Sequence, residues 1–343
     1  MTASSASATD SAVAGGAKGS ASAVRAFAPI AVIAVLLALV PLNFHDSRSM
    51  MTVIITGMLF LSYTIAFNVI FGSTGQLFLC TGALAGIGGF GSAILADRVG
   101  IPMLLSIVVA GALAALVGGL LSWIAVSRSL DTIFIGIVTL AFSLSYQNFL
   151  LGRGDLTGGE DGLRIEAGGD TILDTQVKPY YVFLALAVVY LVLFRVLQRS
   201  HIGWAFRALR DDEVAAELAG VDVTRYRVYA GLIGSAMLGV AGAIFAHHRG
   251  IIGPSTYSFG SVDVRVLVML AFGGIGTLLG PVLGALVFTI LDEILVSYRQ
   301  LREVLYGVVT VGLFLGFRQG VIPALSSLRE KVLPRDGRAR GPT

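Results

Sequence analysis

The sequence contains little charge and almost no cysteine. Cys80 is the one cysteine among 343 residues, which excludes an intramolecular disulfide and any cysteine-rich metal site. Asp, Glu, Lys and Arg together make up 13% of the chain, and the formal net charge is +3 at pH 7. Hydrophobic residues make up 55%, and the mean hydropathy is +0.85. A soluble domain of this length could not bury that much apolar surface.

Four long segments lack charged residues altogether. They are residues 49–96, 99–127, 132–152 and 228–246, with lengths of 48, 29, 21 and 19 residues. About 20 apolar residues cross a bilayer as a helix, so the sequence predicts an all-α, polytopic transmembrane helical bundle. We expect full spans near 26–43, 51–71, 77–96, 101–126, 131–151, 180–196, 226–246 and 304–318.

The region 263–297 has a different pattern, because it contains FGGIGTLLGPVLGA at 272–285. Glycine and proline at this density break a helix. We therefore expect two half-length helices, 264–272 and 281–296, and about 8–10 spans in all. The reversal between the half-helices contains Gly273, Gly274, Gly276, Gly280 and Pro281. Irregular backbone survives in a membrane only where protein or water covers it, so we expect this reversal to be buried in the bundle near the cytoplasmic side.

The distribution of Lys and Arg predicts the orientation. With a cytoplasmic N-terminus, fifteen of these residues lie inside and eight outside, as the positive-inside rule favours. Both termini are then cytoplasmic, the loop 198–225 is cytoplasmic and the loop 152–179 is periplasmic. Residues 1–24 are rich in Ala, Ser, Gly and Thr and are expected to be a disordered tail, and 321–343 a basic tail. The membrane domain is then 25–320. Its first apolar run is interpreted as an uncleaved helix because further spans follow.

Motifs for catalysis and nucleotide binding are missing from the sequence. It contains no G-x(4)-G-K-[ST], H-E-x-x-H or G-x-S-x-G, so we expect no catalytic residue, metal site or cofactor on this chain, and any ATP must bind to another polypeptide. The spans are nearly free of ionisable groups, which argues against an ion-coupled secondary transporter, the alternative of another class. A membrane-embedded enzyme is a third alternative. The polar or flexible residues that could line a translocation path are Asn68, Gly75, Gln76, Tyr146 and Asn148. Interhelical hydrogen bonds would explain Asn68 and Gln76 equally well.

One charged cassette, LRDDEVAAELAG at 209–220, interrupts the apolar sequence. Asp211 or Asp212 is a good N-cap and Gly220 a good C-terminal stop, so a helix of about two turns is predicted. Residues four apart share a helix face, which gives an apolar strip of Val214 and Leu218 and an acidic strip of Glu213 and Glu217. A solvated connector and a docking helix both fit this pattern.

Four motifs in register resemble one family of permeases. Residues 207–227 resemble the cytoplasmic loop of the LivH/LivM-type permeases of branched-chain amino acid ABC transporters, with the pattern R-x-x-E-x-A-A-x-x-x-G-[IV]. The matching residues are Arg210, Glu213, Ala215, Ala216, Gly220 and Val221. NVIFGSTGQLFL at 68–79 is similar to the N-x-x-x-G-x-x-G-Q element of the family, and 273–285 resembles its glycine-rich signature. LTGGEDGL at 156–163 resembles the T-G-G-x-x-G-L outer loop of the LivM half, through Thr157, Gly158, Gly159 and Gly162.

The resemblance, which covers roughly residues 50–320, implies a transport subunit rather than an enzyme. A LivM-like permease lies in the bacterial inner membrane and works with a homologous LivH-like permease or a second copy, two cytoplasmic ATPases that bind ATP and magnesium, and an extracytoplasmic binding protein. Such a permease is embedded in the lipid bilayer and is not expected to bind nucleic acid. In such permeases the loop helix, here including Val214, Glu217 and Leu218, docks in a cleft of the ATPase. Branched-chain or other hydrophobic amino acids are the expected cargo. Leu77–Thr81 replace residues that are often small and polar in relatives, so urea, short amides and small carboxylates remain alternatives.

Overall fold

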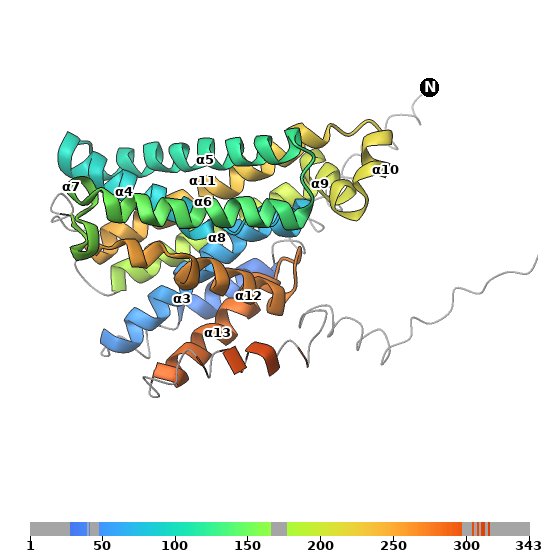
Figure 1. Cartoon of the computed structure of the whole chain (residues 1–343). Helices are drawn as coiled ribbons and strands as arrows, with labels where there is room; N and C mark the ends of the chain where they lie inside the picture. Colours follow the sequence, from blue (N-terminus) through green and yellow to red (C-terminus); the bar gives the residue numbers. More distant parts are fainter. Residues whose placement is uncertain are drawn as a thin grey trace, which may run out of the picture.

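The computed structural model describes residues 28–39, 41, 48–165 and 177–296, together with a few residues between 304 and 315. The tails expected at 1–24 and 321–343 lie outside these residues, as does most of the span expected at 304–318. Within the described part, long helices run side by side along one direction (Figure 1), and the predicted all-α, polytopic bundle is confirmed.

The membrane-length helices follow the charge-free segments of the sequence. They are α3 (Arg48–Phe67), α4 (Thr81–Val99), α5 (Met103–Ser127), α6 (Thr132–Gly152), α8 (Val177–Arg199) and α11 (Val223–Arg249), and a shorter apolar helix covers Ala28–Ala38. Five described helices are long and apolar enough to cross a membrane, if α3 is taken with its extension to Gly72. Asp97 and Arg98 near the end of α4 lower its mean hydropathy, which leaves this helix out of that set.

Helix α11 lies at the centre of the bundle and packs against α4, α5 and α3. Its buried face consists largely of small residues, among them Ala230, Gly231, Gly234 and Ser235. Small side chains let membrane helices approach closely, which increases van der Waals contact where no hydrophobic force drives helices together. The high glycine content of the chain therefore serves helix packing as well as turns.

Short elements close the two ends of the bundle. At one end lie α7 (Gly154–Thr157), the 3-10 helix η2 (Gly159–Asp161) and two strands, β1 (Leu163–Arg164) and β2 (Ile251–Ile252), which pair antiparallel with Leu163 opposite Ile252. At the other end lie α9 (His201–Asp211) and α10 (Glu213–Leu218) (Figure 1). The strand pair was not predicted, because two residues are too few for a recognisable pattern.

The predicted pair of half-helices is present as α12 (Val264–Gly273) and α13 (Gly280–Val296). Pro281 lies in the first turn of α13. A backbone N–H at this position would have no intrahelical acceptor, so the lack of an N–H in proline costs the helix no hydrogen bond. Gly273, Gly274, Gly280 and Pro281 are buried, as expected, but the tip of the reversal is not. Ile275 and Leu279 are 41% and 36% exposed, so the prediction of a fully buried reversal is wrong at these two positions.

An irregular segment, Gly253–Asp263, connects β2 to α12 and was not predicted. It contains the 3-10 helix η3 (Pro254–Tyr257) and the π-helix η4 (Phe259–Asp263). The Tyr257 hydroxyl donates to the Gly242 carbonyl (3.0 Å). Gly242 lies seven residues before the end of α11, which is about 10 Å along the helix at 1.5 Å per residue. Asp263 contacts the first turn of α4, about 27 Å from the far end of that helix. We call Gly253–Asp263 the re-entrant segment, since it runs from the α7 end into the middle of the bundle.

Candidate functional site

The predicted loop helix is present as α10. The Asp212 carboxylate caps it by accepting a hydrogen bond from Ala215 N (3.0 Å), and Gly220 ends it with φ +88°. Six residues are too few for a stable isolated helix, and α10 is held by packing on α9 with Ala216 buried. Val214 and Leu218 are 66% and 86% exposed. The helix therefore presents its apolar strip to the outside of the bundle.

The acidic strip is divided between two environments. Glu217 is exposed, whereas Glu213 forms an ion pair with Arg227 of α11, with 2.8 Å between Oε2 and Nη2. The Arg227 side chain is only 10% exposed, so Glu213 supplies the partner of a nearly buried cation. The sequence placed Glu213 and Glu217 together on one acidic strip of the predicted helix. The Glu213 carboxylate, however, turns to Arg227 and ties α10 to the start of α11.

A second set of hydrogen bonds holds the reversal between α12 and α13. Asn68, in the π-helix η1 (Asn68–Gly72) that extends α3, accepts from Gly276 N (2.8 Å) and donates to the Thr277 carbonyl (2.9 Å). Gln198 donates to the Gly276 carbonyl (3.2 Å). Arg210 of α9 donates to the Gly72 carbonyl (3.0 Å). We call Asn68, Gln198 and Arg210 the reversal clamp.

Gln198 and Arg210 of the clamp line a small cavity of about 50 Å³ at the α9–α10 end, together with residues of η1, α8, α9 and the reversal. A π-turn is wider than an α-turn and is frequent at functional sites. Here it brings the Asn68 amide within reach of two successive backbone groups of the reversal. A backbone that leaves the helical pattern inside a membrane needs such partners, so the clamp explains how the reversal is tolerated.

Gln76 connects the charged loop to the irregular stretch that follows η1. Its Nε2 donates to the Arg227 carbonyl (3.0 Å) and to Thr74 Oγ1 (3.0 Å). Gly75, next to it, has φ +73° and starts this stretch. The loop therefore has two hydrogen-bonded connections into the bundle, one through Glu213, Arg227 and Gln76 and one through Arg210 and Gly72.

The other residues predicted for a translocation path lie elsewhere, on α6. Tyr146 packs against Gly86 of α4, and Asn148 is exposed and donates to the Leu144 carbonyl (3.0 Å). The structure thus brings Asn68, Gly75 and Gln76 together with Arg210 and Glu213, and separates them from Tyr146 and Asn148. A path-lining role for these residues stays a prediction.

The outer-loop motif forms a tight turn at the α7 end. The Thr157 hydroxyl donates to the Leu150 carbonyl (2.6 Å), and Gly158, Gly159 and Gly162 all have positive φ. A Cβ on Gly158 would lie 2.0 Å from the Gly162 carbonyl oxygen, so this position requires glycine. The turn joins the end of α6 to the β1–β2 pair.

A buried carboxylate, Asp263, lies in the middle of the bundle and was missed as a site residue. It accepts hydrogen bonds from Thr81 Oγ1 (2.6 Å), Gly82 N (3.0 Å) and Ser143 Oγ (3.2 Å). Negative charge is stabilised at a helix N-terminus, and Asp263 caps α4 from another part of the chain. The sequence places Asp263 at a helix start, but it does not show that this start lies deep in the bundle.

An ion pair also joins the two half-helices. Arg265 of α12 pairs with Asp292 of α13, with 3.4 Å between Nη1 and Oδ2, and its guanidinium lies 5.8 Å from the centre of the Phe60 ring. A cavity of about 160 Å³ adjoins the pair. The pair crosses between the two antiparallel half-helices, so it fixes their relative position.

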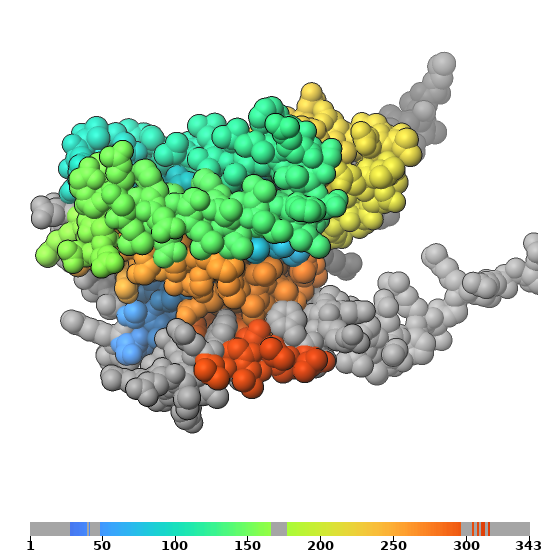
Figure 2. Space-filling model, viewed as in Figure 1, coloured from blue at the N-terminus to red at the C-terminus, as the bar shows by residue number. Residues whose placement is uncertain are grey.

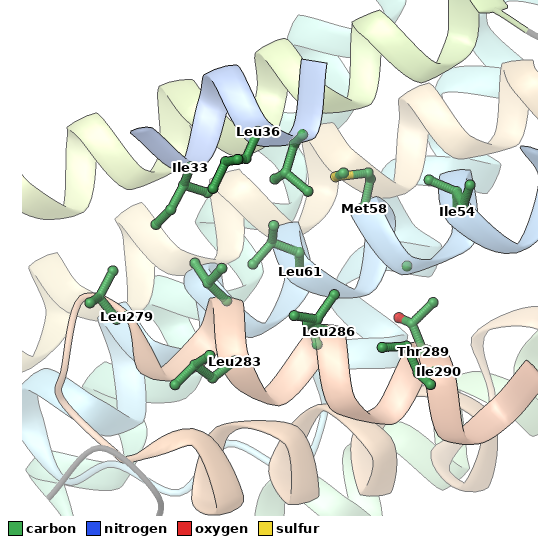
Figure 3. A pocket seen from close by; sticks show the side chains of 14 residues that line it. Ile33, Leu36, Ile54, Met58, Leu61, Leu279, Leu283, Leu286, Thr289 and Ile290 are labelled. Carbon is green, nitrogen blue, oxygen red and sulfur yellow. The ribbon is translucent and has the colours of Figure 1, made fainter. Parts of the chain in front are cut away.

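A third cavity has no chemistry that could select a polar solute. It measures about 510 Å³ and lies between the Ala28–Ala38 helix, α3 and α13 (Figure 3). Figure 3 shows Leu36, Leu61 and Leu286 pointing into it, and Thr289 supplies the only hydroxyl among the described residues that line it. An apolar groove at membrane depth suits an acyl chain better than a polar cargo.

Comparison with known proteins agrees with this geometry. Residues 49–317 match the family described as "Branched-chain amino acid transport system / permease component". The chain belongs to this family. It is 26% identical to the high-affinity branched-chain amino acid transport system permease protein LivM of Escherichia coli K12 over 336 residues, which cover 90% of this chain and 78% of LivM.

Shorter stretches match other permeases. The LivH permease of the same E. coli transport system is 28% identical over 126 residues, 37% of this chain and 40% of LivH. The autoinducer 2 import system permease LsrC of Enterobacter sp. 638 is 35% identical over 124 residues, 34% of this chain and 36% of LsrC. No solved structure matches the chain at the significance applied to these relatives. As a family member with five helices, among the described residues, that are long and apolar enough to cross a membrane, the chain is a multi-pass inner-membrane permease subunit with a transport role.

Proposed function

We propose that this chain is the LivM-like half of an ATP-driven importer. Two cytoplasmic ATPase subunits would supply the energy, and an extracytoplasmic binding protein would deliver the cargo. The second permease would be LivH-like, because the E. coli system to which LivM belongs also has a LivH permease, and this chain is similar to both. ATP and magnesium would bind to the ATPases, since the sequence contains no phosphate-binding loop.

The exposure of Val214 and Leu218 on α10 carries this proposal. Two large apolar side chains at 66% and 86% exposure, on a helix outside the membrane-length elements, favour a protein partner. The loop 198–225 with α10 would be cytoplasmic and receive the ATPase there, and the loop 152–179 would be periplasmic. Both termini would be cytoplasmic, as the distribution of Lys and Arg favours.

The two connections from the loop offer a way to transmit movement of the ATPases. Displacement of α10 would pull on Arg227 and Gln76 through Glu213, and displacement of α9 would pull on Gly72 through Arg210. Both connections end beside the reversal or the stretch that precedes α4. We infer that the reversal and residues 68–80 rearrange when the passage opens toward the cytoplasm.

Branched-chain or other hydrophobic amino acids are the proposed cargo, in keeping with the family description. Urea, short amides and small carboxylates are alternatives within the same class. An ion-coupled carrier would need an ionisable group free to bind its ion. The Asp263 carboxylate already accepts three hydrogen bonds, which disfavours it in that role.

The source of energy separates the importer from an ion-coupled carrier. Uptake of radiolabelled leucine is measured in cells that express the complete transporter. The importer predicts that uptake falls when ATP is depleted and persists when an uncoupler dissipates the proton gradient while ATP is maintained. Uptake that stops with the uncoupler at unchanged ATP would overturn the proposal.

A further inference from the structure

The cavity beside the Arg265–Asp292 pair lies at membrane depth. It measures about 160 Å³, and α3, α12 and α13 supply its walls. Its lining on α3 runs from Thr52 to Phe60, which is about 6–18 Å along the helix from Arg48 at 1.5 Å per residue. In the space-filling view, blue atoms of α3 lie next to atoms in the orange of the half-helices (Figure 2). We call this cavity the half-helix pocket.

Three ionisable side chains line the half-helix pocket, namely Arg265, Asp292 and Glu293. All three are half-buried. Charged groups at membrane depth are costly and face the interior of a bundle or a water-filled cavity rather than lipid. At about 10–15 Å³ for each water molecule, the pocket has room for roughly ten waters, and therefore for one small polar solute.

Helix α13 separates these charges from the surface that suits lipid. Leu286, Ile290 and Ile294 are spaced four residues apart and are 50%, 52% and 58% exposed. Residues at this spacing share a helix face, so α13 carries an exposed apolar stripe. Asp292 and Glu293, on the same two turns, line the pocket instead. The polar character of the pocket is thus a local feature and not a property of the whole helix.

The charges of the half-helix pocket have both signs. Arg265 and Asp292 form an ion pair (3.4 Å), whereas the ion pairs of the described residues do not include Glu293. A guanidinium has five N–H donors, so it can bind a second carboxylate while it keeps Asp292. A solute with only a positive charge would meet Arg265, and one with only a negative charge would meet two carboxylates. A zwitterion presents a favourable charge to each.

Apolar groups form another part of the same wall. Phe60 and Met269 line the pocket and are otherwise buried. At its inner end α3 and α13 touch, because a Cβ on Gly57 would lie 2.7 Å from Thr289 Cγ2. Gly57 and Thr289 also line the apolar cavity of about 510 Å³ (Figure 3). A solute in the pocket therefore meets charged groups and an apolar surface together.

We infer that the half-helix pocket binds an α-amino acid as its zwitterion, with the carboxylate at Arg265, the ammonium group at Glu293 and an apolar side chain against Phe60 and Met269. The inference rests on the proposed function for the class of cargo and deepens it. Urea, short amides and small carboxylates each lack at least one of the two charges. The pocket would therefore favour amino acids over these alternatives within the permease itself.

Photocross-linking of the complete transporter, purified in lipid nanodiscs, tests the inference. The probe is photo-leucine, a leucine analogue that carries a diazirine, and the binding protein is left out so that only the transporter can bind it. Mass spectrometry then identifies the labelled peptides. We expect label in residues 52–60 of α3 or 289–293 of α13, with protection by leucine. Protection by 3-methylbutylamine, which lacks the carboxylate, or by 4-methylpentanoate, which lacks the amino group, should need at least about tenfold higher concentration, because each loses one charge-assisted contact.

Glu293→Gln should lower the labelling about tenfold for the same reason. Glu160→Gln is the matched control, since Glu160 is an exposed carboxylate on η2, outside the pocket, and it should leave the labelling unchanged. Co-purification with the ATPase shows that both variants assemble.

Three results would overturn the inference while leaving the proposed function intact, provided that wild-type leucine uptake is ATP-driven. They are label outside these two segments only, equal protection by leucine and by either analogue, and equal labelling of Glu293→Gln and Glu160→Gln. A wild-type transporter that takes up no leucine would instead overturn the proposed cargo, and with it the inference.

Discussion

The guanidinium group of Arg210 lies directly against Gly276. A Cβ built on Gly276 would lie 2.2 Å from Arg210 Nη1, and the same nitrogen donates to the Gly72 carbonyl at 3.0 Å. Gly276 also has φ +75°. One arginine of α9 therefore touches both the π-helix that extends α3 and the reversal between the half-helices. Through this arginine, α9, which precedes α10 in the loop, is in direct contact with the membrane domain.

Replacing Arg210 with alanine should uncouple ATP hydrolysis from transport. The hydrogen bonds of a charged donor contribute about 1.5–3 kcal/mol, and the lower end applies here because the side chain is 37% exposed. About 1.4 kcal/mol corresponds to a tenfold change, so we expect leucine uptake per ATP hydrolysed to fall about tenfold. Purified transporter in proteoliposomes provides both rates.

Arg225→Ala is the matched control, because Arg225 lies in the same loop. The ion pair described for Arg225 is with the exposed Asp222. This substitution should leave the ratio unchanged. Equal effects of the two substitutions would show that the loop needs positive charge in general and not the contact of Arg210 with Gly72 and Gly276.

Replacing Glu213 with alanine should destabilise the chain even without a partner protein. Arg227, whose side chain is 10% exposed beside Glu213, would lose its carboxylate partner, and a poorly solvated unpaired charge is unfavourable. Because Glu213 itself is 44% exposed, we expect a modest loss of about 1–2 kcal/mol. Thermal unfolding of the purified subunit in detergent measures it. Glu217→Ala, on an exposed residue of the same helix, should leave Tm unchanged, and a Glu213→Ala variant as stable as Glu217→Ala would contradict the role given to this ion pair.

Replacing Asp263 with alanine should destabilise the middle of the bundle. Thr81 Oγ1, Gly82 N and Ser143 Oγ would lose their common acceptor. The two hydroxyls can turn to backbone carbonyls, but the Gly82 amide cannot, so we expect a loss of about 2–3 kcal/mol for the buried donors left unsatisfied. Asp263→Asn keeps one acceptor oxygen and should lie between the wild type and Asp263→Ala in Tm. Identical Tm values for all three proteins would mean that Asp263 does not hold the re-entrant segment.

Local sequence chemistry was sufficient to predict much of this fold. The half-helices were expected at 264–272 and 281–296 and are found at Val264–Gly273 and Gly280–Val296, because Gly274, Gly276 and Pro281 interrupt the helical pattern where they stand. Similarly, an aspartate and a glycine eight or nine positions apart predicted α10, and Asp212 and Gly220 do bound it. Both features depend on neighbours within one or two turns.

The contacts that make up the candidate site depend on residues far apart in the chain. Asn68 and Gly276 are separated by 208 residues, and Gln76 and Arg227 by 151. No spacing rule connects such pairs, since they meet only after α3, α11 and α12 have packed. The re-entrant segment was missed for a related reason. Ser255, Ser258 and Ser261 look like an exposed loop in the sequence, and only the contacts of Tyr257 and Asp263 place them at membrane depth.

The binding of the ATPase by α10 is tested most directly with Leu218→Asp. If this 86% exposed side chain is buried in an ATPase cleft, it contributes about 1.5–3 kcal/mol, which corresponds to roughly 10–100-fold in affinity. Glu217→Gln removes at most an exposed ion pair worth about 0–1 kcal/mol. We predict that Leu218→Asp inserts and folds normally, yet loses both co-purification with the ATPase and ATP-driven uptake, while Glu217→Gln keeps both. A Leu218→Asp subunit that retains ATPase binding and uptake would show that α10 is only a solvated connector and would contradict the account.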